Sequence, residues 1–459
     1  MQREPDLKGA GEYDTASQKG DHEEMNFTKN DMLELLHKNV IPALGCTEPV
    51  CAAIAAADAA SSIGGDIQSI ALNVSPGIYK NGCSVGIAGF DCVGLDYAAA
   101  LGALISKPEA GLEIMKNITP AIAQKAKELV SGEKVRVAIA EDAAGIYVHC
   151  RVETSEGRGE STIQGSHTNI VRTAVNGIPV FEKLPETAVS NDEALKRLQC
   201  TSVSQIKEIV SSASDEELQF LLDGAAMNTD LAGYGLNQNP GIGIAGVLRT
   251  ESGGRMWGNG LIERIAAEVA AAAEARLEGC PYAAMSSAGS GSKGIAVILP
   301  VFETAKEIGA SQSSLLHALA FGHLLNEYIN SKIGKLAPVC TCAIASCTAA
   351  GAAVTWLMGG TDRQIGFAIR NMTGNITGML CDGGKTGCAL KLATASYAAM
   401  LSALLAVSDV GLRPTDGICA DTPEDCIANI ARIGAEGMGH MDKVILSIMK
   451  NKNLGAEKI

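Results

Sequence analysis

Apolar residues recur every three or four positions through most of the chain after residue 192, which is the spacing that buries one face of a helix. Glycine-rich turns separate these stretches. The clearest predicted helices span residues 195–210, 261–277, 313–330, 343–357, 362–372 and 389–406. We therefore expect a large helical domain over residues 191–459.

The pattern changes between residues 67 and 181, where short runs of apolar residues between turn residues are typical of strands. Strands are predicted at residues 70–74, 134–138 and 146–152. Helices are predicted at residues 101–106 and 119–130, where Thr119 can cap the helix and Pro120 suits its first position. This part is expected to be a small α+β domain over residues 65–190.

Residues 29–64 have the pattern of two helices joined by a short break, which Pro42 and Pro49 bracket. The break contains Gly45-Cys46-Thr47-Glu48-Pro49, so Cys46 is expected on a turn beside a helix start. We expect this segment to pack on the helical domain, and we expect residues 1–28, which are polar and charged, to form a disordered leader. The fold class is therefore α+β, with a large mainly helical domain and a smaller β-containing domain near the N-terminal half.

The composition limits which binding partners and which cellular compartment can be expected. The 459 residues carry a net charge of −14 and no Lys/Arg cluster, which argues against binding to nucleic acid or to anionic membranes. No segment is predicted to cross a membrane or to act as a signal peptide, and a cytoplasmic protein is expected. Without a secretion signal, the 14 cysteines do not indicate a disulfide framework.

Two segments crowd cysteines together and are candidates for a metal centre. In Cys381-Asp-Gly-Gly-Lys-Thr-Gly-Cys388, three glycines let the chain fold back so that both thiols can converge. In Cys340-Thr-Cys342, the cysteines come directly before a predicted helix, whose N-terminus favours a thiolate, and Cys347 follows one turn later. Two buried cysteines beside an ordinary glycine turn would give the same pattern without any metal.

The spacing of these cysteines favours an iron–sulfur cluster over zinc. Zinc held by four cysteines usually shows two Cys-x₂₋₄-Cys pairs, which this sequence lacks. An iron–sulfur cluster held by three cysteines needs no such pairs, and it leaves one iron open for a substrate.

Cys46 and Glu48 are candidates for the chemical step. A thiol at a helix start is placed to have a lowered pKa, so Cys46 could act as a base or nucleophile. Glu48 is close enough in sequence to hold a substrate ammonium or to orient a proton transfer. The alternative is that Cys46 is a small buried residue in a tight turn.

A Ser/Gly-rich loop offers hydroxyls and backbone N–H groups to a substrate carboxylate. It does not have the spacing of a Walker A motif, and nothing else supports a pyridoxal phosphate Schiff base on its lysine. Two further polar candidates lie in other loops: Asn81 could line the site, and His167 could contact substrate or shuttle a proton. A structural role is as plausible for both. The candidate substrate-binding residues are Ser286, Ser287, Gly289, Ser290, Lys293, Asn81 and His167.

These motifs together resemble the L-cysteine desulfidase family, which is related to the α-part of bacterial iron–sulfur L-serine dehydratases. The resemblance covers roughly residues 33–411, and its four motifs occur in the same order. They are Leu44-Gly-Cys-Thr-Glu-Pro49, the loop of residues 286–294, Pro338-Val-Cys-Thr-Cys342 and Cys381-Asp-Gly-Gly-Lys-Thr-Gly-Cys-Ala-Leu-Lys391.

The resemblance implies a [4Fe–4S] cluster held by three cysteines and the conversion of L-cysteine to pyruvate, ammonia and hydrogen sulfide. It makes Cys342, Cys381 and Cys388 the ligands and Cys46 the catalytic thiol. Thr341 stands where the family usually has Gly, which leaves Cys340 as an alternative to Cys342 for the third ligand. Cys342 is favoured because it abuts the predicted helix.

Other readings of the sequence remain open. L-Serine ammonia-lyase would need the same cluster and the same carboxylate and ammonium contacts. A redox sensor would need a fully ligated cluster, and structural zinc would need no pocket; neither role requires Cys46 or the Ser/Gly loop. A homodimer is expected, because the Ala/Gly-rich helices suit close contacts between subunits.

Overall fold

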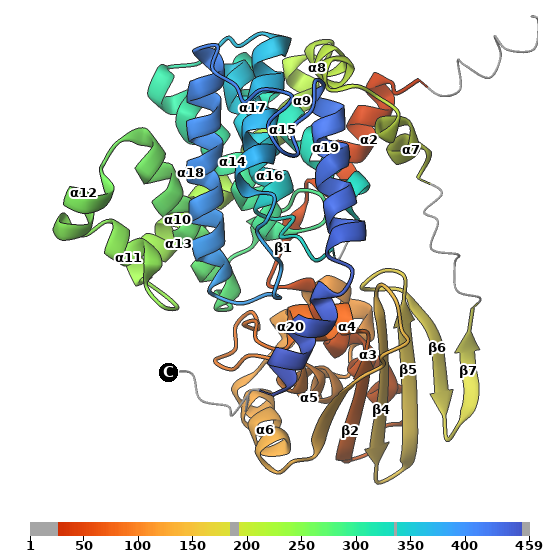
Figure 1. Cartoon of the computed structure of the whole chain (residues 1–459). Helices are drawn as coiled ribbons and strands as arrows, with labels where there is room; N and C mark the ends of the chain where they lie inside the picture. Colours follow the sequence, from red (N-terminus) through yellow and green to blue (C-terminus); the bar gives the residue numbers. More distant parts are fainter. Residues whose placement is uncertain (1–25, 184–191, 335–336, 452–459) are drawn as a thin grey trace, which may run out of the picture.

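The protein forms a body of packed helices and, below it in Figure 1, a twisted six-stranded sheet with helices on one face. The computed structural model describes residues 26–183, 192–334 and 337–451. The predicted leader therefore lies outside the described residues, apart from residues 26–28. The predicted α+β class, with a large helical region and a smaller β-containing region, is confirmed.

The β-containing region is built on one mixed sheet in the order β3-β2-β4-β5-β6-β7, in which β2 pairs with β3 in parallel and all other pairs are antiparallel. Its strands are β2 (Ile67–Val74), β3 (Val135–Ile139), β4 (Tyr147–Thr154), β5 (Gly157–Gln164), β6 (Ile170–Val175) and β7 (Ile178–Glu182). Its helices are α3 (Thr47–Ile63), α4 (Pro76–Gly82), α5 (Leu95–Ile105), a 3₁₀ segment (Pro108–Asn117) and α6 (Pro120–Ser131). Helix α3 packs on β4, β5 and β6, and α5 packs on α3 and β2.

The helical region contains most of the remaining elements. They are α2 (Lys29–Asn39), β1 (Pro42–Ala43), α7 (Glu193–Gln199), α8 (Val203–Ser211), α9 (Asp215–Leu218), α10 (Leu221–Gln238), α11 (Ile244–Leu248), α12 (Glu251–Trp257), α13 (Leu261–Leu277), β8 (Ala284–Met285), α14 (Gly291–Ile308), α15 (Gln312–Ile333), α16 (Ile344–Leu357), α17 (Asp362–Ile376), α18 (Cys388–Val407), α19 (Pro423–Arg432), a π-helical turn (Ile433–Gly437) and α20 (Met441–Lys450).

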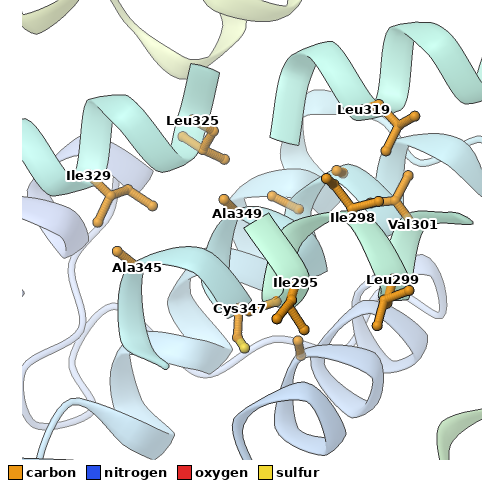
Figure 2. Packing of buried hydrophobic residues seen from close by; sticks show 14 of the residues in the cluster. Ile295, Ile298, Leu299, Val301, Leu319, Leu325, Ile329, Ala345, Cys347 and Ala349 are labelled. Carbon is orange, nitrogen blue, oxygen red and sulfur yellow. The ribbon is translucent and has the colours of Figure 1, made fainter. Parts of the chain in front are cut away.

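Helices α14, α15 and α16 form the centre of the helical core. Figure 2 shows the side chains that meet there, among them Ile298 of α14, Leu319 of α15 and Ala349 of α16, all fully buried. Many core positions are alanine, which lets the helix axes approach closely. This packing holds the N-terminal ends of α14 and α16 in fixed positions, and both ends contribute to the site described below.

The predicted helices of this region are confirmed except for their boundaries and for one break. Residues 195–210 form two helices because the chain turns at Cys200–Ser202, where Ser202 and Gln205 make a capping box that starts α8. The first turn of α14 lies in the segment that was predicted to be a Ser/Gly-rich loop, because this turn consists of glycine, serine and lysine. Strands β5 to β7 were not predicted, and of these β5 is largely polar.

The chain passes between the two regions more than once. Helix α2 packs on α7, α8 and α15, whereas α3 packs on the sheet, so the segment of residues 29–64 spans both regions. At the C-terminal end, α20 returns to pack on α4 of the β-containing region. Backbone hydrogen bonds from Gly86 N–H to Leu277 C=O (2.8 Å) and from Gly89 N–H to Gly279 C=O (3.0 Å) also cross the boundary.

Among the described residues, one helix is long and apolar enough to cross a membrane by length and composition, namely α18. In the structure, 56% of the apolar 18-residue stretch of this helix is buried, and the helix packs against α13, α16 and α17. Its position is that of a core helix.

Gly102 of α5 allows the close crossing with α3, the helix that begins directly after Cys46. A Cβ atom at Gly102 would lie 2.1 Å from the backbone oxygen of Ala53 in α3. We predict that Gly102→Ala lowers the free energy of unfolding by roughly 1–3 kcal/mol, measured by chemical denaturation.

Gly233→Ala is the matched control, because a Cβ at this helical position in α10 would meet nothing within 4 Å. It is expected to stabilise the protein by about 1 kcal/mol, since alanine is the better helix former. Equal effects of the two substitutions would contradict the proposed crossing.

Candidate active site

A cavity of about 270 Å³ lies between the β-containing region and the helical region. Its size is near the lower end of the range of roughly 300–1,000 Å³ for small-ligand sites. The cavity is lined by residues from all four sequence motifs, including Cys46, Glu48, Asn81, His167, Gly289, Ser290, Lys293, Cys340, Cys342, Cys381 and Cys388. Segments more than 300 residues apart in sequence therefore meet around one space.

A two-residue ladder brings the Cys46 turn beside the Ser/Gly loop. Strands β1 and β8 pair antiparallel, with Pro42 opposite Met285 and Ala43 opposite Ala284. Cys46 follows β1 by three residues, and the loop follows β8 directly. On the other edge of β8, the buried Asn228 accepts a hydrogen bond from Met285 N–H (2.8 Å), so this short strand is satisfied on both sides.

Cys46 is the N-cap residue of α3 and is 8% exposed. Arg276 of α13 donates hydrogen bonds to the Cys46 sulfur (Nη1 to Sγ, 3.3 Å) and to the Gly45 carbonyl (Nη2 to O, 2.6 Å). Burial raises the pKa of the Cys46 thiol, and the nearby Arg276 charge opposes this shift without reversing it. The expectation of a lowered pKa was therefore wrong, because it considered the helix start and not the burial of the turn.

Arg276 was not identified from the sequence. The available signal was a charged residue in the last turn of a helix, directly after a stretch in which five of six residues (270–275) are alanine. Such a residue must bury its charge against partners, and Arg276 is only 4% exposed.

Glu48 and Asn81 lie together on the β-containing side of the cavity. Asn81 Nδ2 donates to Glu48 Oε1 (3.3 Å), and Thr47 Oγ1 donates to Glu48 Oε2 (3.2 Å). His167 lines the cavity from the turn between β5 and β6. All three candidates thus face the same space as Cys46.

The Ser/Gly loop is a tight turn that leads into α14. Ser287 and Ser290 exchange backbone hydrogen bonds of 3.1 Å, while Ala288 (φ +45°) and Gly289 (φ +74°) occupy the left-handed region. Ser290 is the N-cap of α14, so the unsatisfied N–H groups and the positive dipole end of this helix face the cavity. This arrangement suits a carboxylate.

Ser286 and Ser287 do not line the cavity, in contrast to their selection as candidates. The Ser286 hydroxyl donates to the Asn39 carbonyl (2.7 Å), which ties α2 to the end of β8. The Ser287 hydroxyl bonds His323 Nδ1 (2.9 Å) and Asn326 Nδ2 (2.8 Å) of α15 beneath the turn. Burial lowers the pKa of His323 to about 3, so this imidazole is neutral and supports the turn.

The two cysteine segments meet through a short antiparallel bridge. Val339 pairs with Leu380, and Cys340 N–H donates to Met379 C=O (2.8 Å) while Cys381 N–H donates to Pro338 C=O (2.6 Å). Side chains alternate between faces in such a pair, so Cys340 and Cys381 project from the same face as diagonal neighbours. Cys342 follows in the turn that starts α16.

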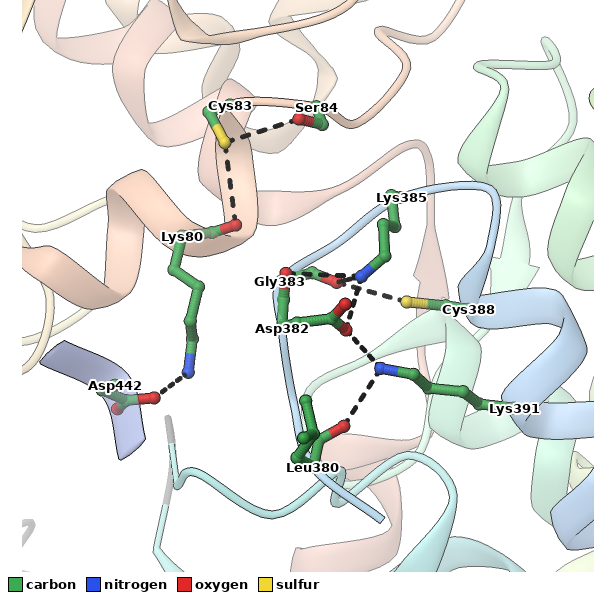
Figure 3. Close-up of polar contacts among 10 residues, drawn as sticks. All are labelled: Lys80, Cys83, Ser84, Leu380, Asp382, Gly383, Lys385, Cys388, Lys391 and Asp442. Carbon is green, nitrogen blue, oxygen red and sulfur yellow. Dashed lines mark hydrogen bonds and ion pairs between the residues drawn. The ribbon is translucent and has the colours of Figure 1, made fainter. Parts of the chain in front are cut away.

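The loop from Cys381 to Cys388 is held by charge and by close backbone contact (Figure 3). Asp382 pairs with both Lys385 and Lys391. Burial raises the pKa of Asp382, but hydrogen bonds from these lysines outweigh it and bring the pKa to about 2. Gly383 (φ +96°) rests on α4, where a Cβ would lie 1.9 Å from the Lys80 oxygen. Only glycine allows the loop to lie this close to the β-containing region.

The thiols around the cavity share an electrostatic environment. Burial and the neighbouring thiolates of Cys342, Cys381 and Cys388 raise the pKa of Cys340 well above its usual value. Burial raises the pKa of Cys342 to about 11, against the lowering effect of Lys293. Burial also raises the pKa of Cys388, against Lys385 and Lys391. Lysine side chains therefore act on the thiols around this cavity, and their positive charge would offset bound negative charge.

Among the described residues, no three His, Cys, Asp or Glu side chains converge closely enough to hold a single metal ion. The thiols instead surround the cavity. Cys347, also considered from the sequence, is fully buried in α16 near Ser396 (Sγ to Oγ, 3.8 Å) and does not line the cavity.

Comparison with known proteins gives one family and a set of close relatives. The family model "Serine dehydratase alpha chain" matches residues 109–447. A UPF0597 protein of Clostridioides difficile is 35% identical over 424 residues, covering 92% of this chain and 99% of the relative. UPF0597 proteins of Oleidesulfovibrio alaskensis (36% over 420 residues, 92% and 97%) and Clostridium botulinum (37% over 423 residues, 91% and 96%) are similar.

The burial of Cys46 predicts slow alkylation that accelerates with pH. With a raised pKa, the reactive thiolate is a small fraction at neutral pH and grows roughly tenfold per pH unit. In metal-free protein treated with iodoacetamide at pH 7.5, we expect Cys46 to react at least about tenfold more slowly than the exposed Cys200. Peptide mapping by mass spectrometry measures both rates. If Cys46 reacted faster than Cys200 at pH 7.5, the result would contradict the raised pKa and support the lowered pKa expected from the sequence.

Proposed function

We propose that this chain, which belongs to the family of serine dehydratase alpha chains, is an iron–sulfur lyase. Its proposed reaction converts L-cysteine to pyruvate, ammonia and hydrogen sulfide. Family membership confirms the relation to the α-part of iron–sulfur serine dehydratases and supports a lyase of the dehydratase type. The observation that carries the finer proposal is the single cavity lined by Cys342, Cys381, Cys388, Cys46 and the N-terminal turn of α14.

The residues around the cavity fit a [4Fe–4S] cluster. Each thiolate of such a cluster binds a different iron, so the thiols need to surround a volume and not to converge on a point. Cys342, Cys381 and Cys388 would hold the cluster, and Cys340 is the fourth thiol in the same cavity. Lys293, Lys385 and Lys391 lie near enough to affect the thiols electrostatically, which suits an anionic cluster. When bound, the cluster supplies an open iron that acts as a Lewis acid towards the substrate.

The residues of the chain would bind and orient the amino acid. The N–H groups at the start of α14, together with Lys293, offer positive charge to the substrate carboxylate. Glu48, which Asn81 and Thr47 orient, offers a carboxylate to the substrate ammonium. Binding both groups would direct the Cα–H bond of the substrate towards Cys46.

Cys46, as thiolate, would take the Cα proton while the Cβ–S bond breaks and sulfide leaves with the bond electrons. The raised pKa makes this thiolate a stronger base than an exposed one, at the cost of a smaller ionised fraction at neutral pH. The product, aminoacrylate, tautomerises to an imine, and water hydrolyses the imine to pyruvate and ammonia.

L-Serine dehydration is the second candidate, and the description of the matching family favours it. The same contacts would hold L-serine, and hydroxide would leave in place of sulfide. Soft iron–sulfur chemistry favours the sulfur leaving group of L-cysteine.

Cluster content tests the ligands independently of turnover. We expect Cys381→Ser and Cys388→Ser each to lose most of the iron and acid-labile sulfide of the anaerobically purified protein, because a serine hydroxyl is a weaker ligand for the soft cluster than the thiolate that it replaces. Cys347→Ser is the control, since Cys347 is fully buried and does not line the cavity, and should keep wild-type iron. Full iron content in both loop variants would exclude the proposed ligands.

Turnover tests the base. The wild-type protein, purified without oxygen, is expected to release pyruvate and sulfide from L-cysteine. Cys46→Ala should keep its iron and lose roughly 100- to 10,000-fold in kcat, the usual contribution of a positioned base. A Cys46→Ala protein with full iron and full turnover would contradict the assigned role.

A further inference from the structure

Arg276 is a buried cation at the junction of three elements. It lies in the last turn of α13 and is 4% exposed, in a helix whose other buried residues are almost all apolar. Its side chain lines the cavity. Placing a guanidinium there requires partners that compensate for its lost hydration.

Those partners belong to two different parts of the site. Nη2 and Nη1 bond Gly45 and Cys46 in the thiol-bearing turn, as described above, and Nη1 also donates to Ser292 Oγ (3.0 Å) in the first turn of α14. One planar group therefore links the proposed base to the proposed carboxylate site.

The fit around this guanidinium is close. A Cβ at Gly291, the first residue of α14, would lie 2.5 Å from Arg276 Nε. The Nε–H is buried and has no hydrogen-bond partner among the described residues. An arginine retained only to stabilise the fold would be expected to use this donor, since an unsatisfied buried donor is destabilising.

Arg370 shows what a purely structural buried arginine looks like in the same chain. It is 8% exposed, and its Nε, Nη1 and Nη2 donate to the backbone carbonyls of Ala420, Leu412 and Asp421. It lines no part of the cavity. The two residues form a matched pair in which Arg370 binds three backbone carbonyls, whereas Arg276 binds a thiol and a hydroxyl besides one carbonyl.

We propose that Arg276 is a positioning residue that fixes the Cys46 sulfur relative to the carboxylate-binding turn of α14. The inference rests on the proposed function, because it assigns Arg276 to the same elimination. The geometry requires the planar fork of arginine, since a lysine ammonium at the end of a flexible stem cannot hold Gly45, Cys46 and Ser292 in one arrangement.

Steady-state kinetics with L-cysteine tests the positioning role. Arg276→Ala is expected to lower kcat by about 100-fold, the cost of misplacing a reacting group, while KM changes by less than about fivefold. Arg276→Lys should remain at least about tenfold below wild type, because charge without the fork does not position the sulfur. Millimolar ethylguanidinium should raise the kcat of Arg276→Ala at least about tenfold by refilling the space.

Arg370→Ala is the control and should lower the melting temperature, keep kcat within threefold of wild type and show no response to ethylguanidinium. An Arg276→Ala variant within threefold of wild-type kcat, or one that ethylguanidinium does not rescue, would overturn the inference. Loss of stability would lower the melting temperature of both alanine variants. It would not allow ethylguanidinium to restore kcat, so loss of stability alone cannot produce the expected result.

Hydrogen exchange of the cluster-free protein separates this inference from the proposed function. We expect Arg276→Ala to speed amide exchange in the peptide containing residues 44–48, and Arg370→Ala to leave that peptide unchanged. If the wild type has no lyase activity but the exchange changes as expected, the function fails and the link between Arg276 and the turn stands. If activity is present and the exchange does not change, the inference alone fails.

Discussion

The pairing of Pro42–Ala43 with Ala284–Met285 is the contact on which the geometry of the site depends. It is only two residues long, yet it sets the Cys46 turn beside the turn that begins α14, across about 240 residues of sequence. Asn228 and Ser286 complete its hydrogen bonding. Because both turns follow the ladder within a few residues, neither can move without breaking it.

A second constraint is the close contact of backbones at the boundary between the two regions. Gly383 against Lys80 and Gly279 against Ile87 approach more closely than any side chain would allow. Lys80, buried in α4, pairs with Asp442 of α20 (2.7 Å), so the C-terminal helix clamps the element on which the cysteine loop rests (Figure 3). Contacts of α4 and α20 thus help to fix the position of the cysteine loop, and the thiols need fixed positions to share a cluster.

Much of the helical framework could be predicted from sequence, because the period of apolar residues fixes it locally, as in α13, whose bounds match the prediction. The start of α14 could not, since glycine and serine there give no apolar period. The cavity residues were found by their chemistry, but Arg276 was missed because its role appears only when the end of α13 meets the Cys46 turn and the start of α14. The pKa of Cys46 was misjudged for the same reason: burial is a tertiary property.

The central claim is that three thiolates of this cavity hold a cluster with one corner open to the amino acid. Electron paramagnetic resonance of the reduced, iron-loaded protein tests it most directly. An open corner predicts a [4Fe–4S] signal that shifts when L-cysteine is added. A signal that is identical with and without L-cysteine would indicate a fully ligated cluster and would contradict the claim.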